Sequence, residues 1–270
     1  MIIQHNIAAI NSYRNLGVNQ SGLSKNLEKL SSGYRINRAG DDAAGLAISE
    51  SMRSQINGLN QATKNAQDAV GLIQTVEGAL TETHSMLQRL TTLASQAANG
   101  TYNSTARGNL QQEVDQLNEE IDRIASSTDF NGIKPIAAGN KNMTFQIGPS
   151  ASETITVAQS SMMASSIGVD SISVEELSSA NAAINTIKSA IDKVSTYRAT
   201  LGAAQNRLEH TINNLKVTSE NITAAESRIR DTDMADEITA FTKNNILLQA
   251  SQSMLAQSNS VPQSILSLLQ

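Results

Sequence analysis

The amino-acid sequence predicts a mostly α-helical fold: an elongated antiparallel helical bundle or coiled coil with a small β-hairpin region. Three observations lead to this prediction. Apolar residues recur with alternating steps of three and four positions over long stretches, which is the spacing of a helix seam. Only 3% of the residues are aromatic, so a core would consist of Leu, Ile, Val and Ala. The 270 residues include only 3 Pro, which leaves long helices uninterrupted.

The longest regular seam occupies residues 184–229 and organises the rest of the chain. Its positions keep a seven-residue repeat without a slip, and most of them are aliphatic. At about 1.5 Å per residue this segment is a rod of roughly 68 Å, so other helices must cover it. Ser173 and Glu176 have the spacing of a capping box and predict where the helix begins. The seam residues are Ile184, Ile187, Ile191, Val194, Arg198, Leu201, Gln205, Leu208, Ile212, Leu215, Ser219, Ile222, Glu226 and Ile229.

Two covering helices are predicted before this rod. The first occupies residues 1 to about 40 and ends near Gly33, because Gly releases the backbone into conformations that a helix does not use. Asp41 and Asp42 then stand where an N-cap and a first-turn carboxylate favour a new helix. This second helix is expected to continue to about residue 98, where an Asn-Gly pair breaks it.

A third covering helix and a hairpin complete the predicted fold. Apolar residues step by four, three, four and three over residues 104–125, which predicts a helix. Between about 140 and 160 the pattern changes: Met143 and Phe145 alternate with polar residues, and so does Ile155 after a turn. Alternation on both sides of a turn predicts a small β-hairpin at one end of the bundle.

Composition and motifs argue against several classes of function. The net charge of -5 and the pI near 5.3 give no basic surface, so nucleic acid is not an expected partner. No window approaches the roughly 18 consecutive apolar residues of a transmembrane helix, so membrane insertion is not expected. The chain has no Cys, its 3 His are far apart, and it contains neither a His-Glu-x-x-His pattern nor a Gly-rich phosphate loop. We therefore expect no enzymatic activity, no catalytic or metal-binding residues, and no cofactor.

The C-terminal segment differs from the rest of the chain. No charged residue occurs in 244–270, yet apolar residues are spread throughout it. Such a segment exposes too much apolar surface in water, so it needs a partner. Three interpretations are open: docking on its own domain, which is the commoner arrangement; a membrane-surface helix, which the lack of Lys and Arg disfavours; and self-association together with the low-charge first 40 residues. Head-to-tail contacts that do not close into a ring produce helical filaments.

Several motifs occur in an order that spans the chain. They are 31–37 (SSGYRIN), 41–45 (DDAAG), 67–69 (QDA), 77–80 (EGAL), 129–132 (DFNG), 145–148 (FQIG), 225–235 (AESRIRDTDMA) and 261–269 (VPQSILSLL). In this combination the chain resembles a bacterial flagellin, in a short form that lacks the variable outer domains. The resemblance covers essentially the whole length and both ends, which makes it far more specific than any one of these motifs.

The resemblance implies that different parts of the chain form different layers of a filament. Residues 1–42 together with 231–270 would form a terminal coiled-coil domain that lines the inner tube of a filament, and 43–230 would form the helical rod around it. It also implies export through the flagellar channel to an extracellular filament, whereas the lack of a secretory signal would by itself predict a cytoplasmic protein. Eight apolar residues at the two ends are expected to make polymer contacts: Ile7, Ile10, Leu23, Leu27, Leu247, Leu255, Ile265 and Leu268.

The resemblance further implies partners. These are an export chaperone that holds the C-terminal region, the hook-associated and cap proteins, and, for the monomer alone, Toll-like receptor 5. Spacing alone favours Leu93 as a seam residue and Arg89 as a solvated charge, whereas the resemblance makes them part of a receptor-binding face. Thr91, Thr92 and Ser95 depart from the residues that the family often has there. The matching positions are Leu87, Gln88, Arg89, Leu93, Ala94 and Gln96, with Glu113 on the next helix.

Two other interpretations stay open at the level of the sequence. One is a hook–filament junction protein, which shares the terminal helices. The other is a secreted adhesive or receptor-binding protein that acts as a monomer. Deletion of residues 231–270 distinguishes a filament subunit from a monomeric binder. The filament subunit would lose polymerisation and keep a folded rod, whereas the binder would keep its binding.

Overall fold

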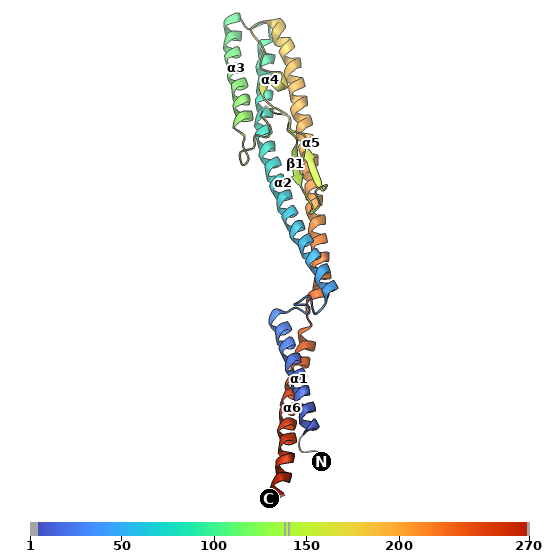
Figure 1. Ribbon diagram of the computed structural model, residues 1–270. Coiled ribbons are helices and arrows are strands. Elements are labelled where there is room, and N and C mark those ends of the chain that lie inside the picture. Colours follow the sequence, from blue (N-terminus) through green and yellow to red (C-terminus); the bar gives the residue numbers. More distant parts are fainter. Residues whose placement is uncertain (1–4, 138, 140, 269–270) are drawn as a thin grey trace. The chain divides into compact units, whose positions relative to one another are not determined.

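The computed structural model describes residues 5–137, 139 and 141–268, with side chains described except at 263 and 265–268. Helices dominate, and the mostly α-helical class with one small antiparallel sheet is confirmed. In chain order the elements are α1 (Ile7–Ser32), α2 (Ala43–Ala97), α3 (Ser104–Ser127), β1 (Met143–Gln146), β2 (Thr154–Val157), α4 (Ala164–Ile167), α5 (Leu177–Arg230) and α6 (Met234–Leu268) (Figure 1).

The chain forms two compact units. The first combines Met1–Ile56 with Glu220–Gln270, and the second is Asn57–Ser219. The long helices α2 and α5 therefore each contribute to both units. The division expected from the sequence, after residue 42 and before residue 231, falls within the first unit, at the breaks between α1 and α2 and between α5 and α6.

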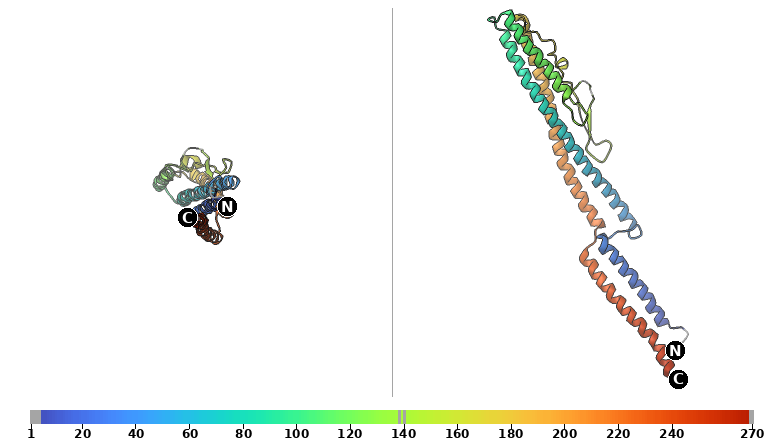
Figure 2. Two further views of the ribbon diagram at one scale, coloured as in Figure 1. Left: turned by 60° about the horizontal axis from the view of Figure 1, so that its bottom comes forward. Right: turned by 90° about the vertical axis from the view of Figure 1, so that its left-hand side faces the viewer.

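In the first unit, α1 and α6 lie side by side and antiparallel (Figures 1 and 2). Near one end of the pair the Asn6 side-chain amide donates to the backbone oxygen of Ser258 (2.7 Å), and near the other Lys29 lies 3.7 Å from Glu237. The Asn6 side chain also caps α1 by accepting a backbone N–H of the first turn. At the other end of α1, Gly33 adopts a φ of 76°, as a C-terminal glycine cap requires.

The turn between α1 and α2 is held by two carboxylates. Asp42 caps α2, since its Oδ1 accepts the N–H of Gly45 (2.9 Å), which confirms the predicted helix start. Asp41 instead folds back onto the turn, where its Oδ2 accepts the N–H groups of Arg38 (3.0 Å) and Asn37 (3.2 Å). These backbone hydrogen bonds favour the ionised carboxylate and lower the pKa of Asp41.

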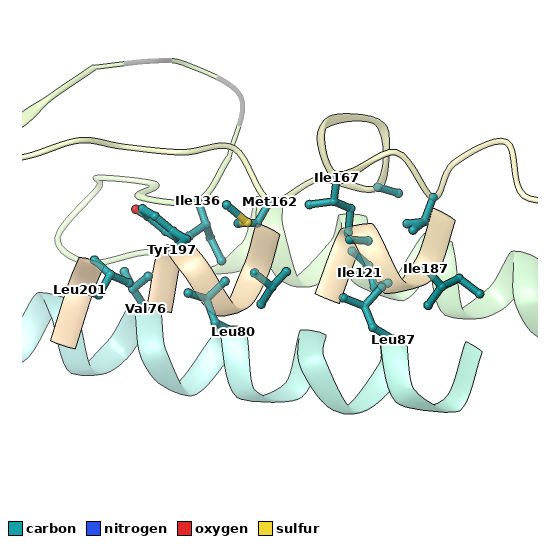
Figure 3. Packing of buried hydrophobic residues seen from close by; sticks show 14 of the residues in the cluster. Val76, Leu80, Leu87, Ile121, Ile136, Met162, Ile167, Ile187, Tyr197 and Leu201 are labelled. Atoms are coloured by element: carbon teal, nitrogen blue, oxygen red, sulfur yellow. The ribbon is translucent and has the colours of Figure 1, made fainter. Parts of the chain in front are cut away.

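The core of the second unit is aliphatic and spans three helices. Leu80 and Leu87 of α2 are fully buried with Ile187 and Leu201 of α5 and with Ile121 of α3 (Figure 3). The seven-residue seam predicted for α5 is confirmed, because every one of its positions is buried or partly buried. Aromatic rings are nearly absent from this core, as the composition predicts.

The predicted start of α5 at Ser173 is wrong. The helix begins at Leu177, because hydrogen bonds hold the preceding segment against α3. There the Gln111 side chain accepts the N–H of Val174 (2.7 Å) and donates to the carbonyl oxygen of Ile172 (3.1 Å). Both apolar side chains are thereby buried, and this burial prevails over the local capping signal.

The β-hairpin predicted at about 140–160 is confirmed. Met143 pairs with Val157 and Gln146 with Thr154 in an antiparallel register. The turn between the strands closes tightly at Gly148, where an added Cβ would overlap the carboxylate of Glu153. Only glycine fits there without displacing that side chain.

Candidate functional site

Large apolar side chains are exposed along both helices of the α1–α6 pair. On α1, Ile7, Ile10 and Leu27 keep 63%, 52% and 50% of their surface exposed. On α6, Leu247 keeps 39% exposed. Four of the residues predicted to make polymer contacts therefore point away from the partner helix and are available to another molecule.

The other predicted polymer residues lie elsewhere. Leu23 and Leu255 are partly buried in the contact between α1 and α6, so they stabilise the pair within one chain. The side chains of Ile265 and Leu268 lie outside those that the structure describes. The prediction did not separate seam residues from outward-facing ones.

Seven further large apolar residues of α1 and α6 are exposed and were not among the predicted polymer contacts. They become recognisable once the helix seam is known, because they fall between its positions. Covering a half-exposed aliphatic side chain contributes about 1 kcal/mol, so a set of this size would supply on the order of 10 kcal/mol, which is comparable to the cost of association. These residues are Tyr13, Val18, Met234, Ile238, Ile246, Met254 and Val261.

Backbone hydrogen bonds join the residues at the C-terminal end of α1 to those at the C-terminal end of α5. The N–H of Arg35 donates to the carbonyl oxygen of Arg230 (2.7 Å), and the N–H of Thr232 donates to that of Gly33 (3.0 Å). The Arg35 guanidinium also donates to the carbonyl oxygen of Ile229 (2.6 Å). Two segments about 200 positions apart in sequence thus form a short antiparallel ladder.

Side chains reinforce this ladder in a cluster that we call the Tyr34 clasp, made of Tyr34, Glu50, Arg53, Glu226 and Arg230. The guanidinium carbons of Arg230 and Arg53 lie 4.8 and 5.8 Å from the centre of the Tyr34 ring. Arg230 pairs with Glu50 (2.6 Å) and Arg53 pairs with Glu226 (2.9 Å). The sequence analysis did not find this cluster.

The predicted receptor-binding face lies on α2 and α3 in the second unit. Arg89 donates through Nε and Nη2 to Oε1 of Glu113, with both distances 2.7 Å, and the two side chains remain about half exposed. Leu87 and Leu93, by contrast, are fully buried in the core. They cannot contact another protein directly in this fold, and their role here is packing.

The two glutamines of that face are both exposed. The Gln88 amide lies 3.1 Å from Nε2 of His84 one turn away. Gln96 lies one turn from Thr92 and two turns from Arg89, so the three share a side of α2. The structure therefore brings Arg89, Glu113 and the glutamines to one polar surface.

A groove of about 700 Å³ lies between α5 and the segment 156–167. Lys193 in its wall donates to the carbonyl oxygen of Ile167 (3.1 Å), and burial raises the pKa of the Tyr197 phenol in its lining. No His is among the residues that line the groove. In the part of the chain that the structure describes, no three His, Cys, Asp or Glu side chains are grouped to hold a metal, and no helix has the length and apolarity to cross a bilayer.

Comparisons with known proteins agree with this architecture. The bacterial flagellin N-terminal helical region matches residues 3–141, and the bacterial flagellin C-terminal helical region matches residues 184–269. A flagellin of Bacillus subtilis (strain 168) is 51% identical, and a flagellar filament 33 kDa core protein of Treponema phagedenis is 47% identical, with each pair of chains covered completely.

Solved structures show the same fold. The crystal structure of Bacillus cereus flagellin is 33% identical, with a TM-score of 0.52 over 60% of this chain and 94% of that one. A putative flagellar hook-associated protein from Vibrio parahaemolyticus, at 12% identity and a TM-score of 0.59 over 71% of this chain and 100% of that one, shares the fold alone. The two matched helical regions and the relatives of equal extent establish that the chain belongs to the bacterial flagellin family.

Proposed function

We propose that this protein is a structural subunit that polymerises into the bacterial flagellar filament and so serves motility. The observation that carries the proposal is the exposed apolar surface of the α1–α6 pair, on a segment whose last 27 residues, 244–270, contain no charge. Relatives named as flagellin and as a flagellar filament core protein support it. Stacked copies of the chain would cover this surface.

The two ends of the chain would act together in the polymer. Residues 1–42 and 231–270 would form the inner tube, and 43–230 would form the layer around it. The contact must be head-to-tail and must not close into a ring, because only such a contact continues indefinitely as a helix. With no outer domain in the chain, the helical layer itself would be the filament surface.

A triple substitution on the outward side of α6 tests the proposal. Changing Ile246, Leu247 and Met254 to Ser removes about 1 kcal/mol of burial at each position, so the concentration needed for polymerisation should rise on the order of 100-fold. Sedimentation of fibres and electron microscopy measure this. The matched control changes two exposed polar neighbours, Gln252→Ser and Gln257→Ser, and should polymerise normally. Unchanged polymerisation of the triple variant would contradict the proposal.

Deletion of residues 231–270 separates this function from that of a monomeric adhesive protein. A filament subunit loses polymerisation and keeps the folded second unit, because that unit has its own core. A monomeric binder keeps its binding. Expression of the chain in a bacterium that lacks its own filament subunit distinguishes a filament subunit from a hook–filament junction protein. A filament subunit restores a long filament, whereas a junction protein restores only a short stretch of it.

The same surface bears on secretion and location. We infer that the chain leaves the cell through the flagellar export channel and functions outside it. The uncharged apolar residues of α6 would then need a cytoplasmic chaperone, and hook-associated and cap proteins would contact the terminal subunits. Copurification of a chaperone with the full chain, but not with the deletion that lacks 231–270, tests this part.

Recognition of the monomer by Toll-like receptor 5 is a second candidate function, favoured by the exposed Arg89–Glu113 pair. An Arg at the centre of an interface commonly contributes 2 kcal/mol or more, so Arg89→Ala should weaken receptor signalling by about 30-fold. Arg123→Ala is the matched control, because Arg123 forms a similar exposed pair with Glu120 on α3. Equal signalling by both variants would refute this assignment.

A further inference from the structure

Three Asn residues of the chain are followed directly by Gly: Asn57, Asn99 and Asn131. Such a pair undergoes spontaneous deamidation when the backbone nitrogen of the Gly attacks the side-chain carbonyl carbon of the Asn. Glycine favours the attack because it has no side chain to obstruct it. All three Asn residues are exposed, so neither the sequence nor exposure to water distinguishes the three pairs. The hydrogen bonds of the Gly nitrogens do distinguish them.

At Asn57 the helix holds the attacking nitrogen. The pair lies in the interior of α2, where the N–H of Gly58 donates to the carbonyl oxygen four residues earlier. An added Cβ at Gly58 would lie 2.8 Å from the side chain of Pro149, so the turn of the hairpin also packs against this part of the helix. The Gly58 nitrogen is therefore released only when the helix opens locally.

At Asn131 a closed turn holds the attacking nitrogen. The N–H of Gly132 donates to Oδ2 of Asp129 (3.3 Å), and the negative charge of this carboxylate opposes loss of the amide proton. Phe130 and Ile133 exchange two backbone hydrogen bonds, of 2.9 and 3.0 Å, around the pair. This turn must also open before the Gly132 nitrogen is released.

At Asn99 the attacking nitrogen makes no hydrogen bond. The pair lies in the connection between α2 and α3, where the N–H of Tyr102 donates to the carbonyl oxygen of Asn99 (3.3 Å). Gly100 is thus the second residue of a β-turn, a position whose N–H has no acceptor within the turn. The Gly100 N–H has no acceptor elsewhere among the described residues, and Gly100 is exposed to water.

Two further contacts prepare this pair for the reaction. The N–H of Thr101 donates to Oδ1 of Asn99 (3.3 Å), where it stabilises the negative charge that forms on this oxygen during the attack. The Arg107 guanidinium donates to the main-chain carbonyl oxygen of Asn99 (3.3 Å) and to that of Ala97 (2.9 Å). Its positive charge therefore lies beside the peptide group whose nitrogen must lose a proton, and it favours the resulting anion.

We propose that Asn99 is a site of spontaneous deamidation, in preference to Asn57 and Asn131. The Gly100 nitrogen loses its proton and bonds to Cγ of Asn99, while the Cγ–Nδ2 bond breaks and the side-chain nitrogen leaves with that proton as ammonia. Water then opens the succinimide ring. Addition of water at Cγ gives Asp, and addition at the main-chain carbonyl carbon gives isoaspartate, in which the chain continues through Cγ.

Either product places a carboxylate close to Arg107, and isoaspartate also lengthens the backbone of the turn by one carbon atom. The reaction needs only water and the second unit, which contains all three pairs. The inference is therefore independent of the proposed polymerisation, and failure of the chain to form fibres would leave it standing.

Incubation of the full chain in warm, mildly alkaline buffer tests the proposal. Mass spectrometry of peptides follows the loss of the amide at each Asn, and enzymatic methylation of isoaspartyl carboxylates detects that product. Asn99 should react at least about 10-fold faster than Asn57 or Asn131, because both other pairs must first open locally. In urea the three rates should agree within about threefold, because the folded surroundings are lost.

Two outcomes would overturn the proposal. One is a rate at Asn99 that does not exceed the other two in the folded chain. The other is a preference for Asn99 that persists unchanged in urea, because the preference would then come from the local sequence and not from the hydrogen bonds of the fold.

Gly100→Ala tests the role of the attacking nitrogen. Nothing lies within 4 Å of an added Cβ at this position, so the fold accepts the methyl group. The methyl group obstructs ring closure and should slow the loss of the Asn99 amide by about 10-fold. Gly78→Ala, also in open space, is the matched control and should leave the rate unchanged. An unchanged rate in Gly100→Ala would contradict attack by this nitrogen.

Arg107→Met tests the contribution of the positive charge. It should slow the reaction at Asn99 by about threefold or more, because the anion at Gly100 loses a neighbouring cation. Arg123→Met removes an exposed Arg of the same helix that pairs with Glu120, and it should leave the rate unchanged. A rate that is equal or higher in Arg107→Met would refute the activating role of Arg107.

Discussion

Replacing Arg230 with Met should open the Tyr34 clasp without unfolding either unit. The Arg230 side chain is only 12% exposed, pairs with Glu50 at 2.6 Å and lies over the Tyr34 ring at 4.8 Å. The ring contact contributes about 1 kcal/mol. The ion pair contributes about 1 kcal/mol more, because Glu50 itself is half exposed and solvent screens it. Met keeps most of the apolar stem, so the expected loss is about 2 kcal/mol.

Hydrogen exchange at two backbone amides measures this loss. The N–H groups of Arg35 and Thr232 bridge the clasp, so their exchange should accelerate by about 30-fold in the Arg230→Met variant. Arg123→Met removes an Arg that is 64% exposed and pairs only with Glu120 on its own helix, and it should leave both amides unchanged. Equal exchange at Arg35 and Thr232 in Arg230→Met and in the unsubstituted chain would refute the reasoning.

Three further predictions concern stability. Gln111→Ala removes the two hydrogen bonds between α3 and the segment before α5, so it should lower the free energy of unfolding, measured in urea, by about 2–3 kcal/mol. The same change at the exposed neighbour, Gln112→Ala, should alter it little. Gly148→Ala should destabilise the hairpin by about 1–3 kcal/mol, whereas Gly78→Ala, in open space within α2, should stabilise the protein by up to about 1 kcal/mol in the same assay. The pKa of Asp41 is lowered in the folded chain, so the Asp41 carboxylate stabilises the fold above its unfolded pKa near 3.8, and this stabilisation is lost as the pH falls through its folded pKa. Hydrogen exchange of the backbone amides in the turn before Asp41 should therefore become faster over that pH range. Asp41→Asn should abolish this pH dependence.

The parts of the fold predicted correctly are those encoded within short stretches of sequence. The seam of α5 follows from a repeat of seven residues, and the end of α1 follows from one glycine at a left-handed position, Gly33. The hairpin follows from alternation around a turn. In each case neighbouring residues contain the whole signal, so nothing distant is needed to read it.

The parts that sequence reasoning missed depend on residues distant in the chain. The start of α5 is displaced by Gln111, which lies on another helix. The Tyr34 clasp requires contacts between side chains about 200 positions apart in the sequence, and no local pattern predicts such contacts. Leu87 and Leu93 were taken both as seam and as receptor contacts, and only the packed core shows that they are buried. Tertiary contacts decide such cases.

The hydrogen bond between Asn6 and Ser258 joins residues 252 positions apart, and this distance sets the order in which the protein can fold. The partner of α1 is α6, which is the last helix of the chain to be synthesised. The entropic cost of closing a loop rises with its length, so we expect the central helices to form their core before the two ends of the chain join.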